Sequence, residues 1–84
     1  MQTVDEQMTP RQLTRPRVAT NLRRARLDRE LSQKQLAGDI GVEREQISEW
    51  EVGRHEPSAR YIELLAEALR VPAHYFQSGT GLGA

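Results

Sequence analysis

The sequence predicts an all-α fold in which five helices form one small domain, and three observations lead to this prediction. Apolar residues recur three and four positions apart along the middle of the chain, which is the spacing of a helix with one buried face. Residue types that begin or end helices flank these stretches, and the sequence has neither a convincing strand pattern nor an internal repeat. A chain of 84 residues has room for a single core of this kind.

The first helix is expected from residue 17 to near Arg29, with arginines between its apolar positions Val18, Leu22 and Ala25. A second helix is expected over residues 32–40, because Ser32 and Gln35 have the spacing of a capping box. Its apolar face carries Leu36, Ala37 and Ile40. Gly41 follows where a left-handed residue would end this helix.

Three further helices complete the predicted domain. Residues 44–51 place Ile47 and Trp50 on one side of a short third helix. Ser58 is the expected N-cap of a fourth helix that runs to about Arg70, with apolar positions Ile62, Leu65, Ala66 and Leu69. A short fifth helix is expected over residues 73–77.

The ends of the chain are expected to differ from this domain over residues 17–77. Residues 1–16 contain Pro10 and Pro16 and show no sustained apolar period, which predicts a flexible arm. Residues 78–84 hold three glycines and are predicted to form a flexible tail.

Composition argues against several classes of protein. Without cysteine the chain has no disulfide, thiolate metal site or cysteine nucleophile, and two histidines alone cannot form a structural zinc site. No metal or other cofactor is therefore expected. The sequence shows neither a secretory signal nor a run of about 20 apolar residues, so we expect a cytoplasmic protein with no membrane partner. An enzyme is not expected, because no pairing of a nucleophile with a base and no phosphate-binding glycine loop is present.

The formal net charge of zero conceals two opposed regions. Residues 10–31 carry seven arginines against two acidic residues, a formal charge of +5, whereas residues 32–57 carry three basic and six acidic residues, a charge of −3. A nucleic-acid-binding protein needs a local basic face more than a basic total. The division is therefore compatible with DNA binding.

Two short helices at residues 32–40 and 44–51, joined by a tight glycine turn, form the pattern of a helix-turn-helix unit. In such a unit the first helix crosses the DNA backbone and the second enters the major groove. Further residues, within this unit and on both sides of it, form a more specific sequence pattern. They are Leu31-Ser32-Gln33-Lys34-Gln35-Leu36-Ala37, Ile40-Gly41-Val42, Ile47-Ser48-Glu49-Trp50-Glu51, Gly53-Arg54, Pro57-Ser58 and Leu65-Ala66-Glu67-Ala68-Leu69.

These positions strongly resemble the Cro/C1 (XRE-type) repressor family over residues 18–76. The resemblance implies a five-helix, lambda-repressor-like domain that binds double-stranded DNA. It also implies a homodimer that acts as a sequence-specific transcriptional regulator, expected to be a repressor, on a palindromic operator. No small-molecule ligand is evident.

The resemblance also implies roles for individual residues. Base edges are expected to be contacted from the third helix by Arg44, Glu45, Gln46 and Glu49. The DNA backbone is expected to be contacted by Gln33, Lys34, Ser48, Arg54 and His55. Arg26 and Glu51 match a pair that forms a partly buried salt bridge in similar proteins. Tyr75 and Phe76 are the expected dimer anchors, because aromatic residues dominate small interfaces.

Two departures from the family pattern affect the third helix. Glu43 stands where the family has a Ser or Thr cap, and a carboxylate suits the helix dipole but caps less well. Together with Glu45 and Glu49 it places three negative charges near a polyanion, opposed locally by Arg44 alone. A glutamate can nevertheless accept a hydrogen bond from cytosine N4. Attraction to phosphate would then come from Lys34, Arg54, the arginines of the first helix and the arm, including Arg11, Arg15 and Arg17.

An alternative interpretation is a protein-interaction module, such as an antitoxin-type domain, whose acidic third helix contacts a basic protein. For Arg23, Arg24 and Arg29 an ordinary solvated surface is as plausible as DNA contact. His55 and His74 are more often hydrogen-bonded or exposed than ligands.

Overall fold

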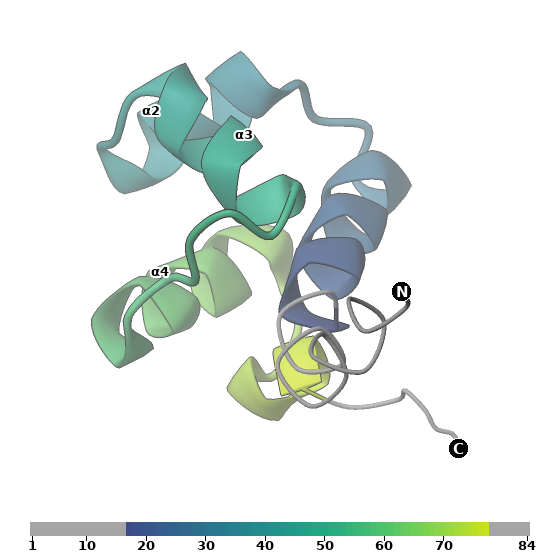
Figure 1. Ribbon diagram of the computed structural model, residues 1–84. Coiled ribbons are helices and arrows are strands. Elements are labelled where there is room, and N and C mark those ends of the chain that lie inside the picture. Colours follow the sequence, from purple (N-terminus) through teal and green to yellow (C-terminus); the bar gives the residue numbers. More distant parts are fainter. Residues whose placement is uncertain (1–16, 78–84) are drawn as a thin grey trace, which may run out of the picture.

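The computed structural model describes residues 17–77, and within that range it is all-helical, which confirms the predicted fold class. A first helix covers residues 17–28. It is followed by α2 (Gln33–Ile40), α3 (Arg44–Glu51), α4 (Ala59–Leu69) and the short η1 (Ala73–Gln77), as Figure 1 shows. No helix in this range is long and apolar enough to span a membrane. The predicted arm (1–16) and tail (78–84) lie outside the described residues.

Three details of the sequence-based prediction need correction. The predicted fifth helix is a 3₁₀-helix, so residues 17–77 form four α-helices and one 3₁₀ segment. The first helix ends at residue 28, one position before the approximate predicted end, and Glu30 adopts a left-handed φ of 59° in the turn that follows. Ile40 and Ile62, expected in the core, are half-buried at its edge.

Local hydrogen bonds explain why α2 begins and ends where it does. The Ser32 hydroxyl accepts a hydrogen bond from the Gln35 backbone N–H at 2.9 Å, and the Gln35 side chain accepts one from the Ser32 N–H at 2.8 Å. This is the predicted capping box. At the other end Gly41 adopts a φ of 80°, and the backbone N–H groups of Gly41 and Val42 both donate to the Ala37 carbonyl. The chain therefore turns sharply before α3.

The core joins all five helical elements. Its largest fully buried side chains come from all five elements, two of them from α4: Leu22, Leu36, Ile47, Leu65, Leu69 and Phe76. Trp50 is 3% exposed and packs against Tyr61 of α4, with ring centroids 5.4 Å apart. Because α3 contributes its inner face to this core, its outer face is held at a fixed angle on the surface.

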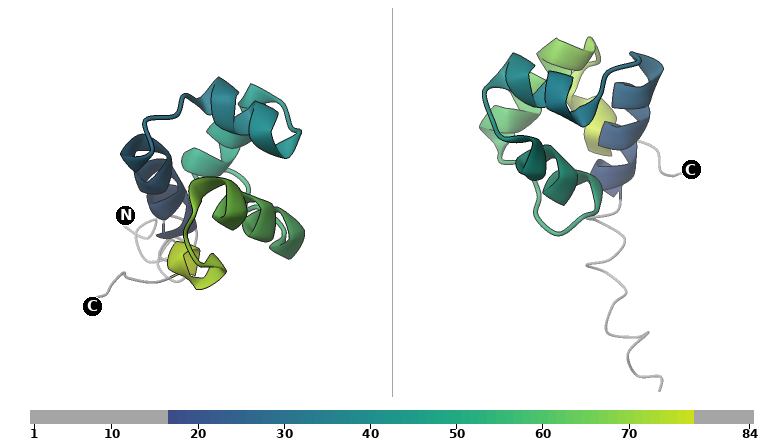
Figure 2. Two further views of the ribbon diagram at one scale, coloured as in Figure 1. Left: turned by 180° about the vertical axis from the view of Figure 1, so that it is seen from behind. Right: turned by 90° about the horizontal axis from the view of Figure 1, so that it is seen from above.

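The first helix and α4 flank the α2–α3 unit, and η1 lies beside the N-terminal half of the first helix in both Figure 1 and Figure 2. Asn21 of the first helix donates hydrogen bonds to the carbonyls of Tyr75 and Phe76, each at 3.1 Å. Arg29 Nε donates to the carbonyl of Leu69 at 3.1 Å. The Asn21 contacts connect the first helix to η1, and the Arg29 contact connects the end of that helix to α4. The first helix, α4 and η1 therefore support α2 and α3 together.

Candidate nucleic-acid interface

α3 presents its first residues to solvent because its opposite side is buried. Ile47 is completely buried and Trp50 nearly so, whereas the side chains of Arg44 and Glu45 are 49% and 74% exposed. Glu43 is the N-cap, and its side chain makes no capping hydrogen bond, as the replacement of Ser or Thr predicts. Arg44 and Glu45 therefore occupy an open helix end that a DNA groove can reach.

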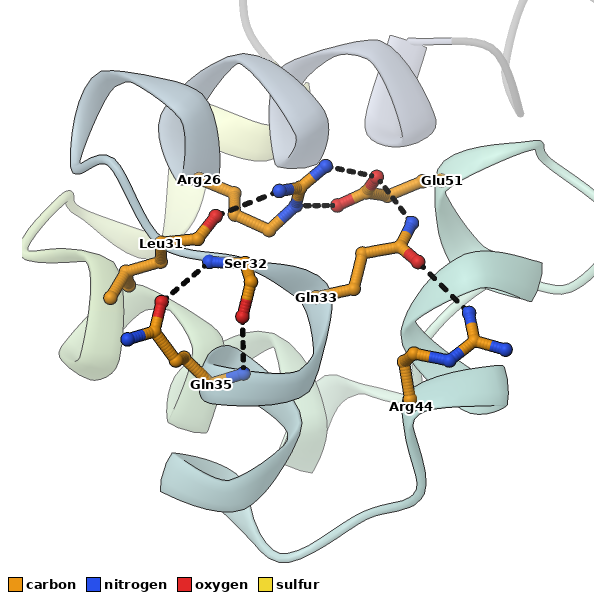
Figure 3. Close-up of polar contacts among 7 residues, drawn as sticks. All are labelled: Arg26, Leu31, Ser32, Gln33, Gln35, Arg44 and Glu51. Atoms are coloured by element: carbon orange, nitrogen blue, oxygen red, sulfur yellow. Dashed lines mark hydrogen bonds and ion pairs between the residues drawn. The ribbon is translucent and has the colours of Figure 1, made fainter.

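The predicted ion pair between Arg26 and Glu51 is present and joins the first helix to the last residue of α3 (Figure 3). Arg26 Nε donates to Glu51 Oε2 at 2.6 Å, and Arg26 Nη2 donates to Glu51 Oε1 at 3.0 Å. A third bond runs from Arg26 Nη1 to the Leu31 carbonyl at 2.8 Å. The two side chains are only 10% and 4% exposed, so the pair is buried and bidentate.

Gln33 extends the ion pair to the surface. Its amide nitrogen donates to Glu51 Oε1 at 3.1 Å, and its amide oxygen accepts a hydrogen bond from Arg44 Nη1 at 3.1 Å. Figure 3 shows this chain of contacts running from Arg26 through Glu51 and Gln33 to Arg44. The exposed guanidinium of Arg44 is therefore connected through Gln33 to the buried ion pair.

The expected backbone-contacting residues do not all lie together. Lys34 is exposed on α2 close in sequence to Gln33, and Ser48 is half-buried on α3. Arg54 and His55 are exposed in the loop that follows α3, with side chains 67% and 65% exposed. The cationic candidates therefore occupy two places, the N-terminus of α2 and the α3–α4 loop.

Glu49 differs from the other residues expected to contact bases. Its side chain is 32% exposed, with one carboxylate oxygen 3.6 Å from Arg54 Nη1 and the other 3.2 Å from His55 Nδ1. The sequence predicted that Arg44 alone would oppose the charges of Glu43, Glu45 and Glu49. The structure instead gives Glu49 two basic neighbours and leaves Glu43 and Glu45 on the open side.

The two aromatic residues expected to anchor a dimer have different surroundings. Phe76 is completely buried in the core of its own chain, which leaves it no surface for a partner. Tyr75 is half-buried and meets the Phe76 ring edge-on, with centroids 5.6 Å apart. Tyr75 alone of this pair has surface with which to contact a second chain.

Two polar residues that connect the elements were missed by sequence reasoning. Asn21 lies on the same helical face as Val18, Leu22 and Ala25, and a polar residue on an apolar face was the available signal for a buried hydrogen bond. Arg29, which bonds to the last turn of α4, gave no such signal, because its partner is a backbone carbonyl 40 residues away in sequence. Residues 17–77 contain no group of three or more His, Cys, Asp or Glu side chains that could hold a metal ion.

Comparison with known proteins identifies the fold. A sequence profile of the XRE-type helix-turn-helix family matches residues 22–76, which is more than half of the chain. The chain belongs to the XRE helix-turn-helix family. A solved relative of this XRE domain is described as a hypothetical transcription factor, NHTF, from Neisseria, and is 32% identical. The match covers 77% of this chain and 75% of that one, with a TM-score of 0.73. No curated protein sequence matches the chain.

Family membership and the structural neighbour together support a DNA-binding regulator. In the XRE domain α2 and α3 are the helix-turn-helix pair, and α3 is the second helix of that pair.

Proposed function

We propose that this XRE domain is a sequence-specific transcriptional repressor that binds a palindromic operator as a homodimer and inserts α3 into the major groove. The observation that carries the proposal is the hydrogen-bonded chain that ends at Arg44. An arginine whose guanidinium is already oriented loses less side-chain entropy when it pairs with a base. Gln33 and the buried Glu51 supply that orientation here.

The first three side chains of α3 have chemistry suited to base recognition. Arg44 can donate two hydrogen bonds to O6 and N7 of guanine, Glu45 can accept one from cytosine N4, and Gln46 can pair with adenine. Arg44 and Glu45 are exposed, and Gln46 is half-buried beside them. Each well-formed contact of this kind discriminates against the wrong base by about 1 to 3 kcal/mol.

Attraction to phosphate is proposed to come from basic groups around α3. Lys34 and Gln33 lie at the start of α2, Arg54 and His55 lie after α3, and Ser48 offers a hydroxyl between them. Exposed arginines of the first helix, Arg23 and Arg24, add positive charge. The basic residues Arg11 and Arg15, also expected to contribute, lie outside the described residues.

The homodimer is proposed to form near η1, with Tyr75 as its aromatic contact. Two copies would place two α3 helices in half-sites about one helical turn, roughly 34 to 36 Å, apart. Sedimentation equilibrium at micromolar concentration, free and with operator duplex, measures the stoichiometry. A monomer in both conditions contradicts this part of the proposal.

Selection of bound duplexes from a random pool, followed by two matched variants, tests the proposed function. Arg44→Ala should reduce discrimination at one base pair per half-site, whereas Lys34→Ala should weaken every sequence alike and lower the salt dependence. Repression is then measured with the selected duplex placed in a reporter promoter. If neither substitution alters affinity for the selected duplex, α3 does not read DNA in the proposed way.

A second candidate function is a protein-interaction module, and the acidic side chains on α3 favour it. Glu43 and Glu45 are both exposed, and the Glu45 side chain is 74% exposed with a single weak ion-pair contact to Arg44 at 3.9 Å. A basic protein surface would complement this charge. This candidate predicts no preferred duplex in the selection experiment.

A further inference from the structure

Glu49 lies on α3 outside the Arg26–Glu51 pair, and its carboxylate contacts the protein instead of pointing freely to solvent. Its Oε2 lies 3.6 Å from Arg54 Nη1 and its Oε1 lies 3.2 Å from His55 Nδ1. Both partners belong to the loop between α3 and α4. The Glu49 side chain therefore links α3 to the loop that carries two of the proposed phosphate-contacting residues.

Burial separates Glu49 from Glu45, the exposed glutamate of this helix. The Oε1 atom is inaccessible to solvent and has no hydrogen bond to any described residue, although His55 Nδ1 lies 3.2 Å away. A carboxylate reads cytosine by accepting a hydrogen bond at an accessible oxygen. The Glu49 side chain is 32% exposed, compared with 74% for Glu45, so Glu45 is much better placed to do this.

The contacts with Glu49 affect the freedom of the Arg54 and His55 side chains in the loop. Arg54 and His55 are otherwise highly exposed, and a long exposed side chain loses rotamer freedom when it contacts phosphate. A neighbouring carboxylate restricts that freedom before DNA arrives. The same pairing offsets part of the negative charge that Glu49 would otherwise present to the backbone.

We propose that Glu49 is a positioning residue for Arg54 and His55 and does not read a base. The base preference of this domain then depends on Arg44, Glu45 and Gln46. This inference rests on the proposed function, because it assigns roles within a DNA interface. It replaces the role in base contact that the family resemblance implies for Glu49.

Glu49→Gln and Glu45→Gln form a matched pair of tests, because each removes one negative charge from the same helix and preserves side-chain shape. Duplex selection with each variant should return a changed base preference at one position for Glu45→Gln. Glu49→Gln should return the wild-type preference at every position. A changed base preference in the Glu49→Gln variant overturns the inference.

Coupling to Arg54 supplies a second measurement that a merely structural role for Glu49 would not alter. Arg54→Ala should weaken operator binding in the wild type, and its effect should be smaller by about two- to tenfold in the Glu49→Gln background, where the arginine is no longer held. In the Glu45→Gln background the effect should equal that in the wild type. Equal effects in all three backgrounds overturn the positioning role.

A variant in the loop provides a control for the case in which Glu49→Gln lowers stability. The effect of His55→Ala on operator affinity is measured in the wild type and in the Glu49→Gln background, and the positioning role predicts a smaller effect in the latter. If the wild type prefers no duplex at all, the proposed function fails. If the wild type is selective and Glu49→Gln changes its base preference, only the role of Glu49 fails.

Discussion

At the scale of single residues, the arrangement of the site depends on one buried ion pair. Glu51 accepts two hydrogen bonds from Arg26 and one from Gln33, and its side chain is 4% exposed. A buried pair of this kind is weak evidence for net stability, because both ions lose their hydration. Its contribution here is to fix the geometry of Gln33 and, through Gln33, of Arg44.

Replacement of one partner of the Arg26–Glu51 pair should strongly destabilise the domain, because it leaves an uncompensated buried charge. Arg26→Ala should lower the free energy of unfolding by about 3 to 5 kcal/mol. A domain of this size has about that much stability in total, so thermal denaturation should show a largely unfolded protein. Arg23→Ala, which removes an exposed arginine of the same helix, should change stability by no more than about 0.5 kcal/mol.

The double variant Arg26→Met, Glu51→Leu removes both charges and keeps apolar side chains in their place. It therefore distinguishes the cost of an unpaired buried charge from the cost of lost packing. Because both ions are removed, most of the loss caused by Arg26→Ala should be recovered. A stable Arg26→Ala protein, or a double variant no better than the single one, would show that the pair is not the buried contact described here.

Residue-level contacts could be predicted where the family pattern includes them and not where they depend on tertiary contacts of this chain. Arg26 with Glu51 followed from the resemblance. The turn of Glu49 toward Arg54 and His55 did not, because the helical pattern assigns position 49 to the outer face and carries no information on the conformation of the loop.

At the scale of the elements, the turn between α2 and α3 determines how α3 stands on the surface. Gly41 has a φ of 80° and ends α2, and Glu43 begins α3 with extended backbone. An added Cβ at Gly41 would meet no heavy atom within 4 Å. The requirement for glycine is therefore one of backbone conformation and not of space.

Two glycines of this region form a matched pair for a stability measurement. Gly41→Ala should destabilise the domain by about 1 to 2 kcal/mol, because an alanine is strained at positive φ. Gly38→Ala, within α2 and also with nothing within 4 Å of the added Cβ, should stabilise it by about 0.8 to 1 kcal/mol. Urea denaturation of both variants checks the signs. Changes of the same sign would contradict the assigned turn.

Helix boundaries were largely predictable because caps are local. Ser32 and Ser58 cap α2 and α4 as their spacing predicts, and α3 covers the predicted residues 44–51. The 3₁₀ form of η1 was not predicted, because a five-residue segment that buries Phe76 takes its conformation from the core around it. Half-burial of Ile40 and Ile62 likewise depends on how α2 meets α4.

At the scale of the whole molecule, DNA binding requires that the attraction of basic residues for phosphate exceed the repulsion caused by acidic residues at α3. Exposed basic residues lie on the first helix (Arg23 and Arg24), on α2 (Lys34) and after α3 (Arg54), whereas exposed Glu43 and Glu45 lie at the start of α3. A DNA complex of this domain should therefore combine phosphate attraction from the surroundings with base recognition from α3. These two contributions differ in their dependence on salt.

The most direct test compares a selected operator duplex with a scrambled duplex of the same composition across a range of salt concentrations. The dissociation constants of both should rise steeply with salt, with a slope of about 0.9 per phosphate contacted on logarithmic axes. The selected duplex should remain at least about a thousandfold tighter at each concentration. Equal affinity for the two duplexes, or binding that does not respond to salt, would contradict the assignment of α3 as a DNA-reading helix.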